Sequence, residues 1–140
     1  YGSVSTGKTY FATVIGVEAC NQGKRVKFYR TAALVNELIE AKNTGKLHKM
    51  MNQLKKIDLL ICNKWGYIPV SKEGSQFLYQ IIAGCKESVI IITNLKFSKC
   101  NSIFHDERLT TAIIDRLVHH SYLLTFTGTS YRLKHSYMNL

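Results

Sequence analysis

The sequence has few acidic residues and almost no proline. Nine Asp and Glu stand against 19 Lys and Arg, which gives a formal net charge of +10, and one proline occurs in 140 residues. This shortage of negative charge favours a polyanionic partner, because clustered basic side chains neutralise nucleic-acid phosphates. A solvated lysine surface that only aids solubility is the alternative. With 46% hydrophobic residues, the chain is sized for one globular domain spanning residues 1–140.

Signals for structural metals, disulfides and membranes are also missing. The four cysteines occur singly, without CxxC or CxxH spacing: Cys20, Cys62, Cys85 and Cys100. This pattern excludes a disulfide framework and a zinc site, so we expect reduced thiols in the core. There is no apolar run of about 18 residues and no signal-like amino terminus. We therefore expect a cytoplasmic protein that does not enter a membrane.

A phosphate-binding motif is the strongest feature that is present. Residues 2–9 read GSVSTGKT, a complete GxxxxGKT loop. Such a loop cradles phosphates with its backbone amides, while Lys8 reaches the β and γ phosphates and the Thr9 hydroxyl ligates Mg²⁺. Ser5 stands where glycine is common and so requires a permissive backbone angle. The predicted nucleotide-binding residues are Gly2, Ser3, Val4, Ser5, Thr6, Gly7, Lys8, Thr9 and Tyr10, with ATP and Mg²⁺ as cofactors.

Hydrophobic periodicity predicts alternating helices and strands. We expect helices at residues 9–22, 31–42 (capped by Thr31), after Gly45, at 73–84 and at 106–119, and strands at 26–29, 58–62, 89–93 and 122–126. This alternation is typical of an α/β fold around a parallel sheet. A phosphate loop normally follows a buried strand, yet only Tyr1 precedes Gly2 and no initiator Met is present. We therefore expect an amino-terminally truncated fragment that lacks the first strand.

Five segments in a fixed order carry a family resemblance: GSVSTGKT, DLLICNKWGYIPVSKEG, VIIITNLKFS, DERLTTAIIDRLVHH and GTSYRL. Together they resemble the IstB family of ATP-binding helpers of IS21-type transposition, which is related to bacterial helicase loaders and replication initiators. The resemblance implies an AAA+ P-loop NTPase with a three-layer α/β/α fold. It also implies nucleotide-dependent assembly on double-stranded DNA as a homo-oligomer, and activation of a transposase partner.

The resemblance assigns roles to three further residues. Asn94, after a buried strand, matches the sensor that orients water or contacts the γ-phosphate. Arg116 corresponds to the arginine finger that a neighbouring subunit supplies, and Arg132 to a second sensor on the far side of ATP. Without the resemblance, Arg116 would be read as a helix-surface residue. The candidates for DNA contacts are Lys24, Arg25, Lys96 and Lys99.

The sequence departs from the family at the acidic motif. Relatives place Asp-Glu after the strand that reads DLLI, whereas this chain has Asn63 and Lys64. Each unit charge at about 4 Å is worth on the order of 4 kcal/mol at an effective dielectric of about 20. The change therefore disfavours Mg²⁺ and removes the general base. The neighbouring Trp65 and Tyr67 are expected to pack rather than to bind ligand.

Several functions stay open from the sequence. The first is an ATP-dependent helper of transposition, and a helicase loader or replication initiator is the alternative within the superfamily. A small-molecule kinase shares the phosphate loop, but the sequence has no evident Arg-rich lid or acceptor-binding carboxylate. Because of Asn63 and Lys64, a scaffold that binds nucleotide and hydrolyses it poorly is also a candidate. Whether the protein is an enzyme is therefore undecided at this stage.

Overall fold

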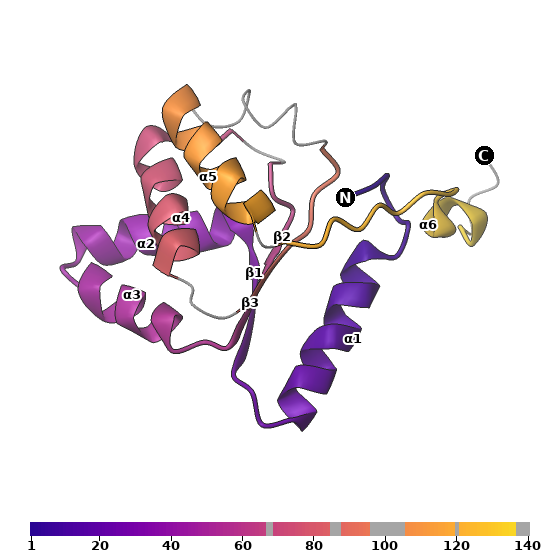
Figure 1. Cartoon of the computed structure of the whole chain (residues 1–140), viewed down its shortest axis with the longest axis horizontal. Helices are drawn as coiled ribbons and strands as arrows, with labels where there is room; N and C mark the ends of the chain where they lie inside the picture. The colour runs from indigo at the N-terminus through magenta and orange to yellow at the C-terminus, as the bar shows by residue number, and fades with distance from the viewer. Residues whose placement is uncertain (67–68, 85–87, 96–105, 120, 137–140) are drawn as a thin grey trace.

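Three parallel strands form the sheet at the centre of the molecule (Figure 1). They are β1 (Val26–Arg30), β2 (Leu59–Asn63) and β3 (Ser88–Ile91), in the order β1-β2-β3, and Phe28 pairs with Ile61, which pairs with Ile90. The structure is a computed structural model that describes residues 1–66, 69–84, 88–95, 106–119 and 121–136. Four of the five residues of β2 are buried, as expected for a central parallel strand.

Helices cover both faces of this sheet. They are α1 (Lys8–Asn21), α2 (Thr31–Asn43), α3 (Leu47–Lys55), α4 (Lys72–Gly84), α5 (Glu107–His119) and the short α6 (Tyr131–Lys134). In Figure 1, α1 lies on one side of the sheet and α2 to α5 lie on the other. This division follows from right-handed crossovers, because the chain runs along the sheet in one direction from β1 to β3. The predicted three-layer α/β/α architecture is confirmed.

Two hydrophobic cores lie on opposite faces of β2. Leu60 and Cys62 belong to the larger core beneath α2, α4 and α5. Leu59 and Ile61 belong to a smaller core with Ala12 of α1. Alternate residues of a strand point to opposite faces, so β2 joins both cores. The sequence pattern of β2 therefore positions its last residue, Asn63, and the following Lys64 at the end of a strand held between two packed layers.

The chain before the phosphate loop pairs with two distant segments. Gly2 N donates to Thr93 O at 3.3 Å, and Phe126 N donates to Tyr1 O at 2.8 Å. Gly2 and Phe126 form an isolated parallel bridge, and a Cβ at Gly2 would collide with the Phe126 carbonyl oxygen. Tyr1 and Gly2 thus lie between the end of β3 and Phe126, the position expected for the first strand.

The strand predicted at residues 122–126 is wrong. Only Phe126 of this segment makes a bridge, and Tyr122, Leu123 and Leu124 are exposed. The backbone hydrogen bonds that join this segment to the start of the described chain run from Tyr1 N to Leu124 O at 2.6 Å and from Phe126 N to Tyr1 O at 2.8 Å, and they do not make a strand ladder. An apolar pattern alone does not make a strand without a neighbour to complete its hydrogen bonds.

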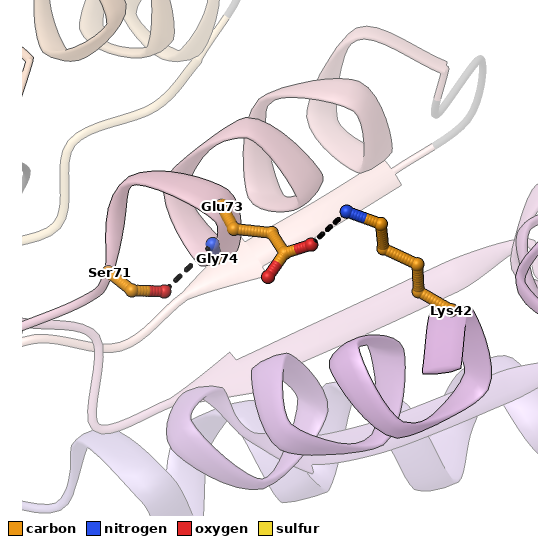
Figure 2. A network of polar contacts seen from close by, with 4 residues as sticks. All are labelled: Lys42, Ser71, Glu73 and Gly74. Atoms are coloured by element: carbon orange, nitrogen blue, oxygen red, sulfur yellow. Dashed lines mark hydrogen bonds and ion pairs between the residues drawn. The ribbon is translucent and has the colours of Figure 1, made fainter. Parts of the chain in front are cut away.

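The sequence SKEG at residues 71–74 organises the start of α4. Ser71 Oγ accepts a hydrogen bond from Gly74 N at 3.1 Å, and Glu73 forms an ion pair with Lys42 of α2, as Figure 2 shows. A Cβ at Gly74 would lie 2.6 Å from Val35 Cγ1. These contacts cap the helix and let it pack closely against α2. The SKEG segment, which forms part of the family resemblance, therefore serves to cap α4 and to pack it against α2.

Two smaller predictions are corrected. Thr31 does not cap α2 but is its first residue, and its hydroxyl donates to Asn63 O at 2.9 Å. Cys62 is buried as expected, whereas Cys20 is exposed because Ala19 takes the packing position in the last turn of α1. Cys85 and Cys100 lie outside the described residues. Within the described part of the chain, every helix is too short or too polar to cross a bilayer.

Candidate nucleotide-binding site

The phosphate loop has the backbone that its sequence predicts. Gly7 has a φ of 91° and Ser5 a φ of 61°, so the expectation of a permissive angle at Ser5 is confirmed. Gly7 is the N-cap of α1, no side chain caps the helix, and its first turn contains no acidic residue. The amides of this turn are therefore available to an anion, at the positive end of the helix dipole.

Lys8 is folded over the loop from which it projects. Its Nζ donates to Gly2 O at 2.8 Å, to Ser3 O, and to Thr6 Oγ1 at 3.4 Å. The residue is buried, and this burial lowers the pKa of its ammonium group. A phosphate oxygen that binds Lys8 would compete with these acceptors and add the negative charge that the loop itself does not supply.

A pocket of about 900 Å³ opens beside the loop. Its lining residues come from the loop, from the carboxyl ends of all three strands and from the carboxyl-terminal segment: Val4, Ser5, Thr6, Gly7, Lys8, Thr9, Tyr10, Arg30, Asn63, Lys64, Ile92, Asn94, Thr127, Thr129, Tyr131 and Arg132. Ligands of open α/β sheets bind at this edge. Among these described lining residues four are basic and none is acidic, so the pocket suits a polyanion.

The turn after β2 is fixed on both sides of Lys64. Asn63 O accepts from the Thr31 hydroxyl at 2.9 Å, and Trp65 O accepts from Thr93 Oγ1 at 2.7 Å. Trp65 is buried, which confirms its expected packing role, and its N donates to Ile92 O at 2.9 Å. Lys64 itself has a φ of 56°. These contacts hold Lys64 at the pocket in a backbone conformation that L-residues rarely adopt.

Two predicted sensor residues line the same pocket. Asn94 follows β3, and Arg132 lies on α6. The helix α6 is tied to the phosphate loop because Tyr131 N donates to Ser5 O at 2.9 Å. The structure thus brings Asn94 and Arg132 together with Lys8, although they are far apart in the sequence.

Other predicted residues lie elsewhere. Gly2 and Ser3 are not among the lining residues and contribute carbonyl oxygens to Lys8 instead. Arg116 is exposed on α5, and its Nη1 donates to Ala83 O of α4 at 3.5 Å. Arg116 is thus a helix-surface residue that is not among the described lining residues of the pocket. Its role as an arginine finger remains a prediction.

The described candidates for DNA contacts lie at the opposite edge of the sheet. Lys24 and Arg25 are exposed in the turn before β1. Arg25 N donates to Asp58 Oδ2 at 2.8 Å, which places this turn beside the start of β2. Lys55 and Lys56 precede β2 and are also exposed, so these residues enlarge the basic edge. Lys96 and Lys99 lie outside the described residues.

Several pocket residues were missed by the sequence analysis. Arg30 was not among the predicted site residues, although its position at the end of β1 could have placed it beside Asn63 and Asn94. Thr127, Thr129 and Tyr131 reach the pocket through the contact between α6 and Ser5. No local pattern encodes that contact.

With the fold and the pocket in place, residues 1–139 match the IstB-like ATP binding protein family. The chain belongs to this family. It is 36% identical over 135 residues to the insertion sequence IS21 ATP-binding protein of Pseudomonas aeruginosa, covering 95% of this chain and 51% of that protein. It is also 36% identical over 135 residues to the IS5376 ATP-binding protein of Geobacillus stearothermophilus, covering 95% and 54%. This IstB-like chain thus spans about half the length of the curated relatives it matches.

Solved structures support the AAA+ fold of this IstB-like chain. AMPPCP-bound DnaA from Aquifex aeolicus superposes with a TM-score of 0.78 at 21% identity, over 96% of this chain and 41% of DnaA. The DnaC helicase loader superposes with a TM-score of 0.69 at 21% identity, over 90% of this chain and 75% of DnaC. At this identity the likeness establishes the fold alone.

Proposed function

We propose that this IstB-like chain binds ATP or ADP at its phosphate loop and, within a longer protein, assists the transposition of an insertion sequence. The observation that carries the proposal is a basic pocket at the loop, lined by Lys8, Thr9, Asn94 and Arg132, in a chain that belongs to an ATP-binding family. Lys8 and the amides of α1 would hold the phosphates, while Asn94 and Arg132 would contact them from the other walls.

The partners of this helper are part of the proposal. Relatives encoded by insertion sequences support double-stranded DNA and a transposase as the partners. Lys24 and Arg25 would contact DNA phosphates from the edge of the sheet away from the nucleotide. Arg116, exposed on α5, would complete the pocket of a second copy in a homo-oligomer. The described residues contain no feature that favours a helicase loader over a transposition helper.

A nucleotide-binding scaffold with little hydrolysis is the second candidate. Asn63 and Lys64 line the pocket where the family resemblance implies Asp and Glu, and the described lining residues include no carboxylate. A general base contributes about 10²–10⁴-fold to the rate of a reaction. In this second role, the protein would use the binding of nucleotide, rather than rapid hydrolysis of ATP, to control its assembly.

Phosphate release from ATP, measured with and without duplex DNA, tests this proposal. We expect the wild-type chain to release phosphate at close to the background rate. The double variant Asn63→Asp with Lys64→Glu should release it about 100-fold faster, because it regains a carboxylate base. Duplex DNA should stimulate the double variant further. A wild-type rate equal to that of the double variant, and lost in Lys8→Ala, would contradict the scaffold role.

A further inference from the structure

The pocket is a poor site for the Mg²⁺ ion that usually accompanies ATP in this fold. Magnesium prefers oxygen ligands, commonly one or two carboxylates together with phosphate oxygens. The described lining residues offer hydroxyl and amide oxygens, among them those of Thr9 and Asn63, but no carboxylate. Asn63 Oδ1 already accepts a hydrogen bond from Lys64 N at 2.9 Å. Across the described residues, no group of three or more His, Cys, Asp or Glu could hold a metal ion. The residues therefore do not fit the metal.

A basic residue, Lys64, lies where metal ligands would be expected. Lys64 lines the pocket together with Lys8, Arg30 and Arg132. Its backbone is held by the hydrogen bonds from Thr31 Oγ1 to Asn63 O and from Trp65 N to Ile92 O. Because both flanking peptide groups are anchored, the backbone of Lys64 stays at the rim of the pocket, and its flexible four-carbon side chain can reach a ligand bound there. An ammonium group at this place repels a divalent cation and attracts a phosphate oxygen.

We infer that this pocket binds the triphosphate of ATP without Mg²⁺, and that Lys64 supplies the positive charge that the metal supplies in P-loop NTPases generally. The inference rests on the proposed nucleotide-binding function. Metal-free ATP carries more negative charge than its magnesium complex, so a pocket with four basic and no acidic lining residues favours the metal-free form. The chain would then respond to nucleotide irrespective of the supply of magnesium.

The test is a titration of ATP into the full chain, in EDTA and in excess MgCl₂, followed by calorimetry. Wild type should bind ATP in EDTA at least as tightly as in MgCl₂. Lys64→Gln should weaken binding in EDTA about tenfold, the loss expected for one charge-assisted hydrogen bond. Lys64→Arg should restore it, since the charge returns. Asn63→Asp with Lys64→Glu should invert the preference and make binding depend on magnesium.

Lys49→Gln is the matched control, because Lys49 is an exposed lysine on α3 outside the nucleotide pocket. It should leave binding unchanged in both buffers. Thermal melting of each variant without nucleotide separates a folding defect from a binding defect. Wild-type binding that requires MgCl₂, or equal binding of wild type and Lys64→Gln in EDTA, overturns the inference and leaves the proposed function standing. Absence of binding in both buffers overturns both.

Discussion

At the scale of single residues, backbone strain coincides with the pocket. Ser5 and Lys64 are the non-glycine residues with positive φ in the described part of the chain, at 61° and 56°, and both line the pocket. An L-residue in this region costs about 1–2 kcal/mol. Such strain persists where the surroundings determine the conformation, as they do at ligand sites. Ser5 is held by the bond from Tyr131 to its carbonyl oxygen.

Ser5→Gly should stabilise the chain. Relief of the left-handed backbone, worth about 1–2 kcal/mol, outweighs the entropic cost of glycine, about 0.5–1 kcal/mol. Urea denaturation should therefore show a free energy of unfolding higher by roughly 1 kcal/mol or less. Ser3→Gly in the same loop is the control, because Ser3 does not have a positive φ and should only incur the entropic cost. An equal decrease in the free energy of unfolding in both variants would show that the backbone of Ser5 is not strained.

At the scale of elements, close helix packing sets the position of the residues around the site. The helix α4 approaches α2 at Gly74, where a Cβ would lie 2.6 Å from Val35 Cγ1 and 2.8 Å from Val70 Cγ1. Val35 and Val70 are buried, so neither methyl group has room to move. The pairing of Glu73 with Lys42 is exposed and adds little by comparison.

Gly74→Ala should destabilise the fold by about 1–3 kcal/mol, the usual cost of overpacking a core. Gly84→Ala is the matched control on the same helix, since its Cβ would meet only Lys55 Cε at 3.5 Å and Lys55 Cγ at 4.0 Å. That change should be neutral or slightly stabilising, because alanine favours helix. Chemical denaturation of both variants measures the difference. Similar stabilities of Gly74→Ala and Gly84→Ala would refute the packing role of Gly74.

The sequence predicted those elements that have local signals and packed neighbours. The apolar run of β2 and the periodicity of α2 and α4 gave bounds within one or two residues of those observed. Residues 122–126 have a similar apolar content but form a bridge only at Phe126, so the same reasoning failed there. In α1, Phe11, Val14 and Val17 are exposed, because small residues, Ala12 and Gly16, make its close contact with the sheet.

The residues of the nucleotide-binding site, like the helices and strands, could be predicted only in part. The phosphate loop was evident from residue types alone, and the departure at Asn63 and Lys64 followed from the family resemblance. The convergence of Arg30 with these residues followed from the parallel sheet but was overlooked. A backbone hydrogen bond from Tyr131 N to Ser5 O attaches α6 to the loop. A contact between residues so far apart in the sequence has no local sequence signal.

At the scale of the whole molecule, the pocket is assembled from both ends of the described chain. Tyr131 N donates a hydrogen bond to Ser5 O. The rings of Phe11 and Phe126 pack edge to face, with their centroids 5.7 Å apart. The carboxyl-terminal segment therefore closes one wall of the pocket, and the three strand ends form another. This arrangement makes binding of nucleotide depend on the complete fold rather than on the loop alone.

The central claim is that the phosphate loop binds a triphosphate, and calorimetric titration of wild type and Lys8→Ala with ATP tests it most directly. Lys8 is the buried ammonium of the loop, so its loss should weaken binding by about 100-fold, the upper range for a charged hydrogen bond. We expect measurable heat and saturation for wild type, and no saturation over the same concentrations for Lys8→Ala. Equal affinities of the two proteins, or no heat from wild type, would contradict the account.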